Sequence, residues 1–314
     1  MLLLCLSFGT VLLAAAPCRA GMLFVIVSKS LSDRNFIRVY EAALAEAVKN
    51  GDRMILIGGE GQAHFRKQDQ EVSAILRRHP DGLAISVLRS DHLAENSIGA
   101  ARDMGIPVIA FDSDFTPKYH YLRAGYIGTD NVELGRELGR QAKVHRQVGG
   151  TVAILTGGLD ETNLEDRIQG VVQELGLGRE GSPWRLARSP IPCRDDYDQS
   201  LKQLETLLDD PAVDVIISVG WWAQMARGYE SLVRRYQRTL SNKSKILIFA
   251  GAAPRQVELF QKRLSHVNIG LDFEAMGRLA YQYLRTLAGG RTIPPVTHTP
   301  MRIFSQDCQY IPGR

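Results

Sequence analysis

The chain has 314 residues, of which 45% are hydrophobic and 23% are charged, and its formal net charge is +4. This length is about twice that of a typical domain and the composition is that of a globular protein, so two hydrophobic cores are expected. Basic residues lie along the whole chain beside acidic ones, which argues against a nucleic-acid-binding surface.

The start of the chain has the composition of an export signal. An apolar stretch over residues 2–16 is followed by Pro17–Cys18–Arg19–Ala20, a segment suited to signal peptidase. The stretch is shorter than the ~20 residues of a comfortable membrane-spanning helix. We therefore predict that residues 1–20 are a signal peptide and that the mature protein is periplasmic. An uncleaved membrane anchor is the alternative, because the positively charged region that usually begins a signal is missing.

Two of the four cysteines, Cys5 and Cys18, lie in the predicted signal peptide. The mature chain keeps Cys193 and Cys308, an even number in an oxidising compartment. They either form a disulfide or are two unrelated buried thiols.

After residue 20, apolar segments of strand length alternate with amphipathic helices. The pattern predicts strands at 22–27, 53–57, 82–86 and 107–111, and helices at 36–50, 68–78 and 93–104. Continuous apolar strands separated by amphipathic helices indicate a parallel sheet that is covered on both faces.

A second series of the same kind begins after residues 126–131. It predicts helices at 132–144, 166–175, 200–208 and 222–238, and strands at 151–155, 184–191, 213–219 and 245–249. A strand at 267–271, a helix at 274–289 and an extended segment at 301–305 complete the chain. The fold class predicted is α/β, with two Rossmann-like lobes. Because no low-complexity linker separates them, any motion between the lobes should bend a few crossover residues.

Motifs of catalysis and cofactor binding are missing from the sequence. The run Gly58–Gly59–Glu60–Gly61 lacks the third glycine of a dinucleotide-binding loop and any Gly-Lys-Ser/Thr ending, so it is a turn. The histidines never stand at ligand spacing from a cysteine or carboxylate. We therefore predict no metal, no cofactor and no enzymatic activity. An exported enzyme using Asp112 and Asp160 as an acid/base pair is the alternative, although no nucleophile accompanies them.

Two strand ends carry candidate ligand-binding residues. Asp112 follows the strand at 107–111, where a carboxylate faces the crevice at the carboxyl edge of a parallel sheet and can accept bonds from two hydroxyls. Its alternative is a solvated loop residue or helix N-cap. Asp160 follows the strand at 151–155, and Arg167 stands at an expected helix start, where the helix dipole does not favour a cation. Arg167 therefore either makes a bidentate contact with a ligand or forms an ion pair with nearby acidic residues.

Aromatic residues supply the apolar part of this candidate site. Trp221 and Trp222 follow the strand that ends at Val219–Gly220, and such rings suit stacking on the flat face of a sugar. Adjacent residues entering a helix point in different directions, so at most one of the two is expected to line the cleft. Phe36 and Tyr197 are weaker candidates of the same kind.

Together these features resemble the periplasmic sugar-binding proteins of the ribose-binding type, which are related to the effector domains of lactose-repressor-like regulators. An export signal stands before residue 22 in place of a DNA-reading helix-turn-helix, so the repressor branch is not expected. The resemblance covers nearly all of the mature chain and rests on the following segments: Phe24–Ser28 with Asn35–Phe36, Gly105–Asp112, Tyr126–Asn131 with Gly135, Val152–Gly157 with Asn163, Arg167 and Gly170, Pro211–Ile217, and Gly277.

The resemblance implies a monomeric type I periplasmic binding protein whose lobes are joined by three hinge crossovers near residues 127, 271 and 298. The N-terminal lobe would contain residues 21–127 and 272–297, and the C-terminal lobe residues 128–271 and 298–314. A ligand would be held between the lobes by their closure. In this family's arrangement, Phe36 and Tyr197 would stack on a sugar, Asp112 would accept its hydroxyls and Arg167 would bind it.

Several positions depart from the sugar-binding pattern. Ser113 stands where these proteins usually have an arginine, Trp221 and Trp222 where they have an Asn-Asp pair, and Ala250 where they have another aspartate. Leu271 replaces the hinge glutamine, for which the neighbouring Asp272 could substitute. Since each charged hydrogen bond to a sugar contributes on the order of 1.5–3 kcal/mol, the departures predict a modified or less polar sugar-like ligand, or a site retuned for sensing.

Two functions are consistent with this resemblance. The first is a solute-binding protein that delivers a sugar or sugar-like ligand to the membrane permease of an ABC importer. The second is a periplasmic sensor that signals to a membrane receptor such as a histidine kinase or chemoreceptor. In both, ligand stabilises the closed lobes because it contacts both of them.

Overall fold

Two sheets dominate the computed structural model, which describes residues 21–306 and 308–311. The first has the strand order β12-β5-β4-β3-β1-β2 and is parallel throughout. Its register pairs Val25 with Ile55 and with Leu83. The strands are β1 (Leu23–Val27), β2 (Arg53–Ile57), β3 (Gly82–Ile85), β4 (Val108–Phe111), β5 (Gly125–Gly128) and β12 (Val296–His298).

The second sheet has the order β14-β13-β11-β10-β9-β6-β7, and β8 also pairs with β6. Its strands are parallel except that β13 is antiparallel to β11 and to β14, with Ile269 opposite Ile303. The strands are β6 (Gly150–Thr156), β7 (Trp184–Leu186), β8 (Ile191–Pro192), β9 (Val215–Ser218), β10 (Ile246–Ala250), β11 (Val267–Leu271), β13 (Met301–Ser305) and β14 (Cys308–Ile311).

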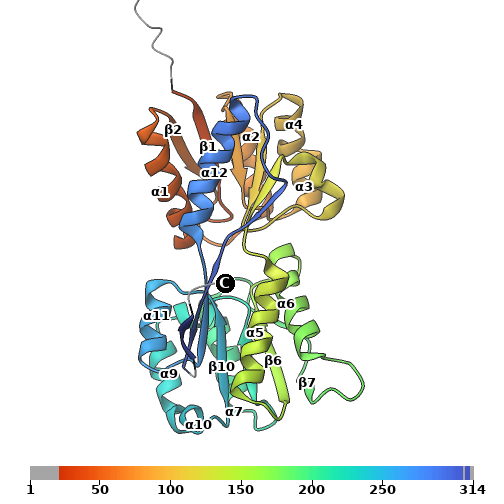
Figure 1. Ribbon diagram of the computed structural model, residues 1–314, viewed down its shortest axis with the longest axis vertical. Helices are drawn as coiled ribbons and strands as arrows, with labels where there is room; N and C mark the ends of the chain where they lie inside the picture. Colours follow the sequence, from red (N-terminus) through yellow and green to blue (C-terminus); the bar gives the residue numbers. More distant parts are fainter. Residues whose placement is uncertain (1–20, 307, 312–314) are drawn as a thin grey trace, which may run out of the picture.

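Helices cover each sheet, and each sheet with its helices is called a lobe below (Figure 1). The first lobe carries α1 (Arg34–Lys49), α2 (Phe65–Leu76), α3 (Ser90–Glu95), α4 (Ser97–Asp103), the 3-10 helix η1 (Pro117–Leu122) and α12 (Phe273–Ala288). The second lobe carries α5 (Asn131–His145), α6 (Thr162–Leu175), α7 (Tyr197–Asp209), α8 (Trp222–Met225), α9 (Tyr229–Arg235), α10 (Gln237–Ser241) and α11 (Pro254–Gln261).

Both faces of each sheet are buried. In β3, Leu83 packs into one hydrophobic cluster and the next residue, Ala84, into another on the opposite face. In β9, Val215 and Ile216 divide in the same way. Because side chains alternate along a strand, the apolar runs of the sequence fill two cores per lobe. The predicted α/β fold with two Rossmann-like lobes is confirmed.

The chain passes from one lobe to the other three times (Figure 1). It leaves the first lobe after β5, returns after β11 to form α12, and leaves again after β12 to form β13. At the waist between the lobes the Thr299 backbone N–H donates to the Gly128 carbonyl, which ties two of these crossovers together.

Three predicted elements are divided in the structure, and one observed helix was not predicted. The helix expected at 93–104 breaks at Asn96, whose backbone is not helical (φ −126°, ψ −112°). The helix expected at 222–238 is three short helices, because Ala226 adopts an extended conformation after α8. The strand expected at 184–191 is two short strands, β7 and β8. Helix α11, which no prediction included, begins with Pro254 at its first turn, where the fixed proline φ favours a helix start.

The close contact between α5 and α6 depends on two glycines. A Cβ atom built at Gly135 would lie 2.1 Å from the Arg167 carbonyl oxygen, and one at Gly170 would lie 2.1 Å from the Val132 carbonyl oxygen. These are backbone atoms, which cannot rotate away. The two helices therefore touch backbone to backbone, and this contact sets the position of Arg167.

Substitution Gly135→Ala should lower the free energy of unfolding by about 1–3 kcal/mol, because the added methyl group forces the helices apart. The measurement is urea unfolding of the purified protein. Gly289→Ala is the matched control: its added Cβ would come no closer than 3.4 Å to another atom, and the backbone there has a φ of −84° that alanine adopts readily. An unfolding midpoint for Gly135→Ala equal to that of the control would contradict the contact.

Candidate functional site

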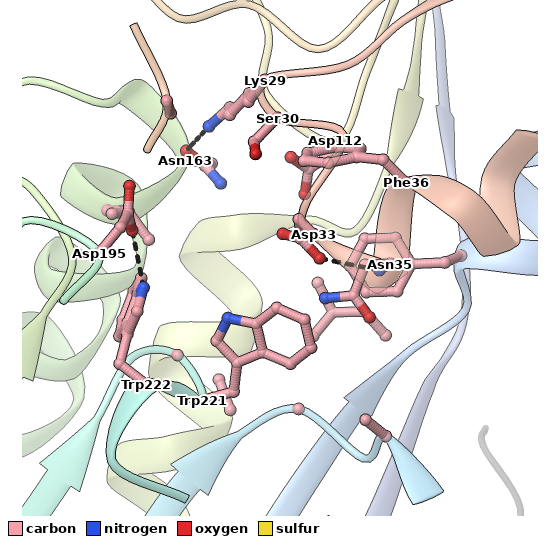
Figure 2. A pocket seen from close by; sticks show the side chains of 18 of the residues that line it. Lys29, Ser30, Asp33, Asn35, Phe36, Asp112, Asn163, Asp195, Trp221 and Trp222 are labelled. Atoms are coloured by element: carbon pink, nitrogen blue, oxygen red, sulfur yellow. Dashed lines mark hydrogen bonds between the residues drawn. The ribbon is translucent and has the colours of Figure 1, made fainter. Parts of the chain in front are cut away.

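A cavity of about 390 Å³ lies between the two lobes, at the carboxyl ends of strands from both sheets (Figure 2). This position follows from the topology, since parallel strands end at one edge and each edge faces the other lobe. The residues that line the cavity are Lys29, Ser30, Ser32, Asp33, Asn35, Phe36, Arg38, Gly61, Gln62, Ala63, Asp112, Glu161, Asn163, Leu164, Arg167, Asp195, Tyr197, Gly220, Trp221, Trp222, Ala250, Gly251, Ala252, Ala253, Gln256, Leu271 and Phe273.

Asp112 lines this cavity, directly after β4, as its strand-end position predicted. Its φ of +58° lies in the left-handed region, which aspartate tolerates better than most residues. Hydrogen bonds to the carboxylate and to the backbone carbonyl of Asp112 hold this conformation. Ser86 Oγ donates to the carboxylate at 2.9 Å, and the backbone carbonyl accepts bonds from the Tyr126 hydroxyl at 3.0 Å and from Asn131 Nδ2 at 3.4 Å.

Arg167 also lines the cavity, but it does not begin its helix as predicted. Helix α6 starts at Thr162, so Arg167 stands in the second turn. Its Nε donates to Asn131 Oδ1 at 2.9 Å, its Nη1 donates to the Val219 carbonyl at 3.0 Å, and its Nη2 lies 4.0 Å from Asp112 Oδ1. Burial lowers the pKa of the guanidinium, and Asp112 acts against that shift. The prediction that Arg167 stands at a helix start was therefore wrong, whereas the burial of its guanidinium supports a specific role for this residue.

Lys29 is a residue of the cavity that the sequence analysis missed. It follows the end of β1, and its Nζ lies 2.6 Å from Glu161 Oε2 and 3.2 Å from Asn163 Oδ1 at the start of α6. Burial alone would lower its pKa, but the Glu161 carboxylate, and after it Asp112, hold the pKa above the usual value. The ion pair joins the first lobe to the second. The strand-end rule that found Asp112 would also have found Lys29.

The four predicted aromatic residues all border the cavity. Trp222 is 6% exposed and belongs to the core of the second lobe, and its Nε1 donates to Asp195 Oδ1 at 2.7 Å. Trp221 is only partly buried, and its indole lies within the cavity in Figure 2. Phe36 packs edge-to-face on Phe111 with the ring centroids 6.0 Å apart. The expectation that at most one tryptophan lines the cleft is corrected: both do, and Trp222 serves the core as well.

Two further carboxylates of the cavity, Asp33 and Asp195, were missed because neither directly follows a strand. Asp33 is the N-cap of α1 and accepts a bond from the Asn35 backbone N–H at 2.8 Å. Burial raises the pKa of Asp33 to about 7, against the effect of that bond. Burial, and after it the Glu161 charge, also raise the pKa of Asp195, although the Trp222 hydrogen bond and Lys29 oppose the shift.

The two remaining candidates, Asp160 and Asp272, do not line the cavity. Asp160 is exposed in the loop before α6, and the next residue, Glu161, lines the cavity in its place. Asp272 is the N-cap of α12, where its carboxylate accepts a bond from the Ala275 backbone N–H at 2.8 Å. Unlike Asp33, which caps α1 and also lines the cavity, Asp272 is not among the lining residues. The suggestion that Asp272 substitutes for a hinge glutamine is therefore not supported.

Other predictions concern metals, membranes and cysteines. Within the described residues no group of three or more histidine, cysteine, aspartate or glutamate residues is arranged to hold a metal ion, and no helix is long and apolar enough to cross a bilayer. Cys193 is a buried free thiol, and burial raises its pKa to about 12. The predicted signal peptide, residues 1–20, and the side chain of Cys308 lie outside the part that the structure describes.

Replacing each tryptophan in turn should separate core packing from cavity lining. Trp222→Ala should lower the free energy of unfolding by about 3–5 kcal/mol, because it empties a core site and removes the hydrogen-bond donor to Asp195. Trp221→Ala should cost less than about 1.5 kcal/mol, since its ring is partly exposed to the cavity. Urea unfolding of both variants measures the difference, and equal losses would show that both rings are structural.

The raised pKa of Asp33 gives the protein a pH-dependent stability. The folded pKa of about 7 exceeds the ordinary value of 3.8, so the folded protein binds more protons and its stability falls as the pH rises from about 4 through 7. Asp33→Asn keeps a helix-capping side chain and removes this loss. The variant should match the wild type near pH 4 and exceed it by about 1–2 kcal/mol at pH 8. A difference that does not change with pH would contradict burial of the carboxylate.

Known proteins share this sequence pattern and this two-lobed arrangement. The sequence matches the family described as "Periplasmic binding protein domain" over residues 24–292. A D-ribose/D-allose-binding protein of Pseudomonas aeruginosa is 27% identical over 150 residues, 46% of this chain and 47% of the relative, so the chain spans about half the length of the curated relative that it matches.

Two solved structures show the fold. An ABC transporter solute-binding protein from Burkholderia graminis, in complex with D-arabinose, has a TM-score of 0.80 at 22% identity, with 92% of this chain and 96% of that one covered. XylFII in its complex with LytSN has a TM-score of 0.76 at 17% identity, with 91% and 98% covered. The matched family consists of binding proteins and not of enzymes. The family match over residues 24–292 shows that the chain belongs to the periplasmic binding protein family, and its two-lobed α/β fold agrees with that match.

Proposed function

We propose that the protein is an exported periplasmic solute-binding protein that captures a sugar or sugar-like small molecule between its lobes for an ABC importer. The observation that carries this proposal is that the cavity between the lobes is bordered by aromatic rings and titratable side chains from both of them. Its volume of about 390 Å³ suits a small molecule, and pockets for such ligands combine apolar walls with a few oriented polar groups.

The chemistry of the lining supports a polyhydroxylated ligand. The Asp112 carboxylate can accept bonds from hydroxyl groups, and the neighbouring Arg167 guanidinium, whose Nη2 lies 4.0 Å from Asp112 Oδ1, can donate to ring or hydroxyl oxygens. Phe36 and Trp221 offer rings for the apolar face of a sugar. The relatives described above include one named for D-ribose and D-allose and one solved with D-arabinose.

Closure of the lobes would complete the site. We propose that residues 21–127 and 272–297 move as one lobe and residues 128–271 and 298–314 as the other, bending at the three crossovers. The contact between Lys29 and Glu161 already joins the two lobes at 2.6 Å. A ligand that also contacts both would favour the closed form by its difference in affinity for the two forms. Export through a signal peptide at residues 1–20 belongs to the same proposal.

A second candidate function is ligand sensing, in which the closed protein signals to a membrane receptor such as a histidine kinase or chemoreceptor. The observation that favours it is the similarity to XylFII, which was solved in a complex with LytSN. The same fold can therefore assemble with a second protein. The partner, permease or receptor, distinguishes the two functions, because ligand capture between the lobes is common to both.

The structure changes what is expected of the ligand. The departures from the sugar-binding pattern predicted a less polar molecule, because Ser113, Ala250 and Leu271 replace polar residues. Polar groups from other positions also line the cavity, namely Lys29, Asp33, Asn35, Glu161, Asn163 and Asp195. The reason to expect a less polar ligand is therefore removed, and a fully hydroxylated sugar becomes compatible with the lining.

Thermal unfolding of the mature protein against a panel of free, phosphorylated and methylated sugars and cyclitols tests the proposal. The protein is first freed of ligand by unfolding and refolding. A true ligand at 100 times its dissociation constant should stabilise the protein by about 2.7 kcal/mol. Asp112→Asn, which retains a residue suited to the left-handed backbone, should fold normally and weaken that ligand roughly tenfold or more. A panel without any stabilising compound would contradict sugar capture.

A further inference from the structure

The charges that line the cavity do not balance. Within the described residues, seven charged side chains border it, four of them acidic and three basic: Asp33, Asp112, Glu161, Asp195, Lys29, Arg38 and Arg167. Each basic group already has an acidic partner. Lys29 pairs with Glu161, Arg167 lies 4.0 Å from Asp112, and Arg38 forms a two-point contact of 2.8 and 2.9 Å with Glu274, which lies outside the cavity.

Two carboxylates, Asp33 and Asp195, are left over from this pairing. Within residues 21–306 no lysine, arginine or histidine lies within ion-pair distance of either one. Their hydrogen-bond donors are neutral: the Asn35 backbone N–H for Asp33 and the Trp222 indole for Asp195. Both carboxylates are partly buried, and Lys29, the basic group that acts on each of them, is itself paired with Glu161. A cationic group on a ligand would supply the ion-pair partner that neither carboxylate has beside it.

The unpaired carboxylates border the same cavity as aromatic rings. Figure 2 shows the Asp33 carboxylate and the Trp221 indole bordering the same space, with Asp195 and Trp222 on the opposite side. Tyr197 also lines the cavity near these groups. A carboxylate beside the face of an indole ring is a combination that binds an organic ammonium group, through an ion pair on one side and a cation–π contact on the other.

We propose that the ligand carries a positive charge beside its hydroxyl groups, as an amino sugar does, and that Asp33 binds its ammonium group against Trp221. This inference rests on the proposed function, because it names the chemical class of the molecule captured in the same cavity. Asp112 and Arg167 bind the hydroxyl groups, and Asp195 supplies a second negative charge that attracts the cation. The remaining charged groups around Asp33, which are Lys29 and Asp112, are engaged in the pairs described above.

Isothermal titration calorimetry of the full mature protein with matched pairs of ligands tests this inference. Each pair consists of an amino sugar and its parent sugar, with a hydroxyl in place of the amine: D-glucosamine with D-glucose, D-galactosamine with D-galactose, and D-mannosamine with D-mannose. The wild type should bind the amino member of at least one pair roughly tenfold or more tightly than its parent, because only the ammonium group forms the ion pair.

Variants assign the preference to its carboxylate. Asp33→Asn keeps the helix cap and removes the charge, so it should lose the preference for the amine while still binding the parent sugar. Asp272→Asn is the matched control, because Asp272 caps α12 in the same manner and lies outside the cavity. It should keep the wild-type preference. Asp195→Asn should reduce the preference less than Asp33→Asn does. If Asp33→Asn fails to fold, titration of Asp195→Asn still tests whether a carboxylate of the cavity produces the preference.

Three other outcomes would each contradict a specific claim. Parent sugars that bind as tightly as their amines would overturn the inference and leave the proposed function standing. A preference that survives in Asp33→Asn would remove Asp33 from the role given to it. A protein that binds neither member of any pair would count against sugar capture itself, and against the inference with it.

Discussion

The side chain of Asn131 connects the binding groups of the two lobes. Its Nδ2 donates to the Asp112 carbonyl of the first lobe, and its Oδ1 accepts from Arg167 Nε of the second. Asn131 begins α5 directly after the crossover from β5. Asp112 and Arg167, whose charged groups lie 4.0 Å apart, are thus both hydrogen-bonded to a residue at the crossover. Under the proposed closure of the lobes, such an anchor at the crossover would keep the two side chains in place relative to each other.

Backbone packing between α5 and α6 fixes the position of Arg167. Arg167 lies in the turn of α6 that touches α5, and the missing side chain of Gly135 is what lets the Arg167 carbonyl approach. Asn131 is one turn earlier in the same helix α5. The two helices therefore place the donor and the acceptor of the Arg167–Asn131 hydrogen bond as a rigid unit. Such support by packing and hydrogen bonds is what keeps a binding residue in one geometry.

Sequence reasoning located the strands and one edge of the site, because apolar runs that end in polar residues have a single interpretation in a parallel sheet. Asp112 was found in this way. Asp33 and Asp195 were not, since each comes from a loop that only the folded chain brings to the cavity. Asp272 failed for the opposite reason: its place next to a strand end is also a helix N-cap. Sequence alone does not decide between these two uses of an aspartate, because both require the same residue after a strand.

Burial of charge also explains how such a protein responds to ligand. Burial raises the pKa of both Asp33 and Asp195 in this structure, and the cost of burying these carboxylates would oppose the proposed closure of the lobes. The contact between Lys29 and Glu161 would act in the opposite direction, since it joins the two lobes. A ligand that hydrogen-bonds or neutralises the carboxylates removes the opposing effect and leaves the favourable one. Closure is then coupled to occupancy of the cavity, without a separate switch elsewhere in the fold.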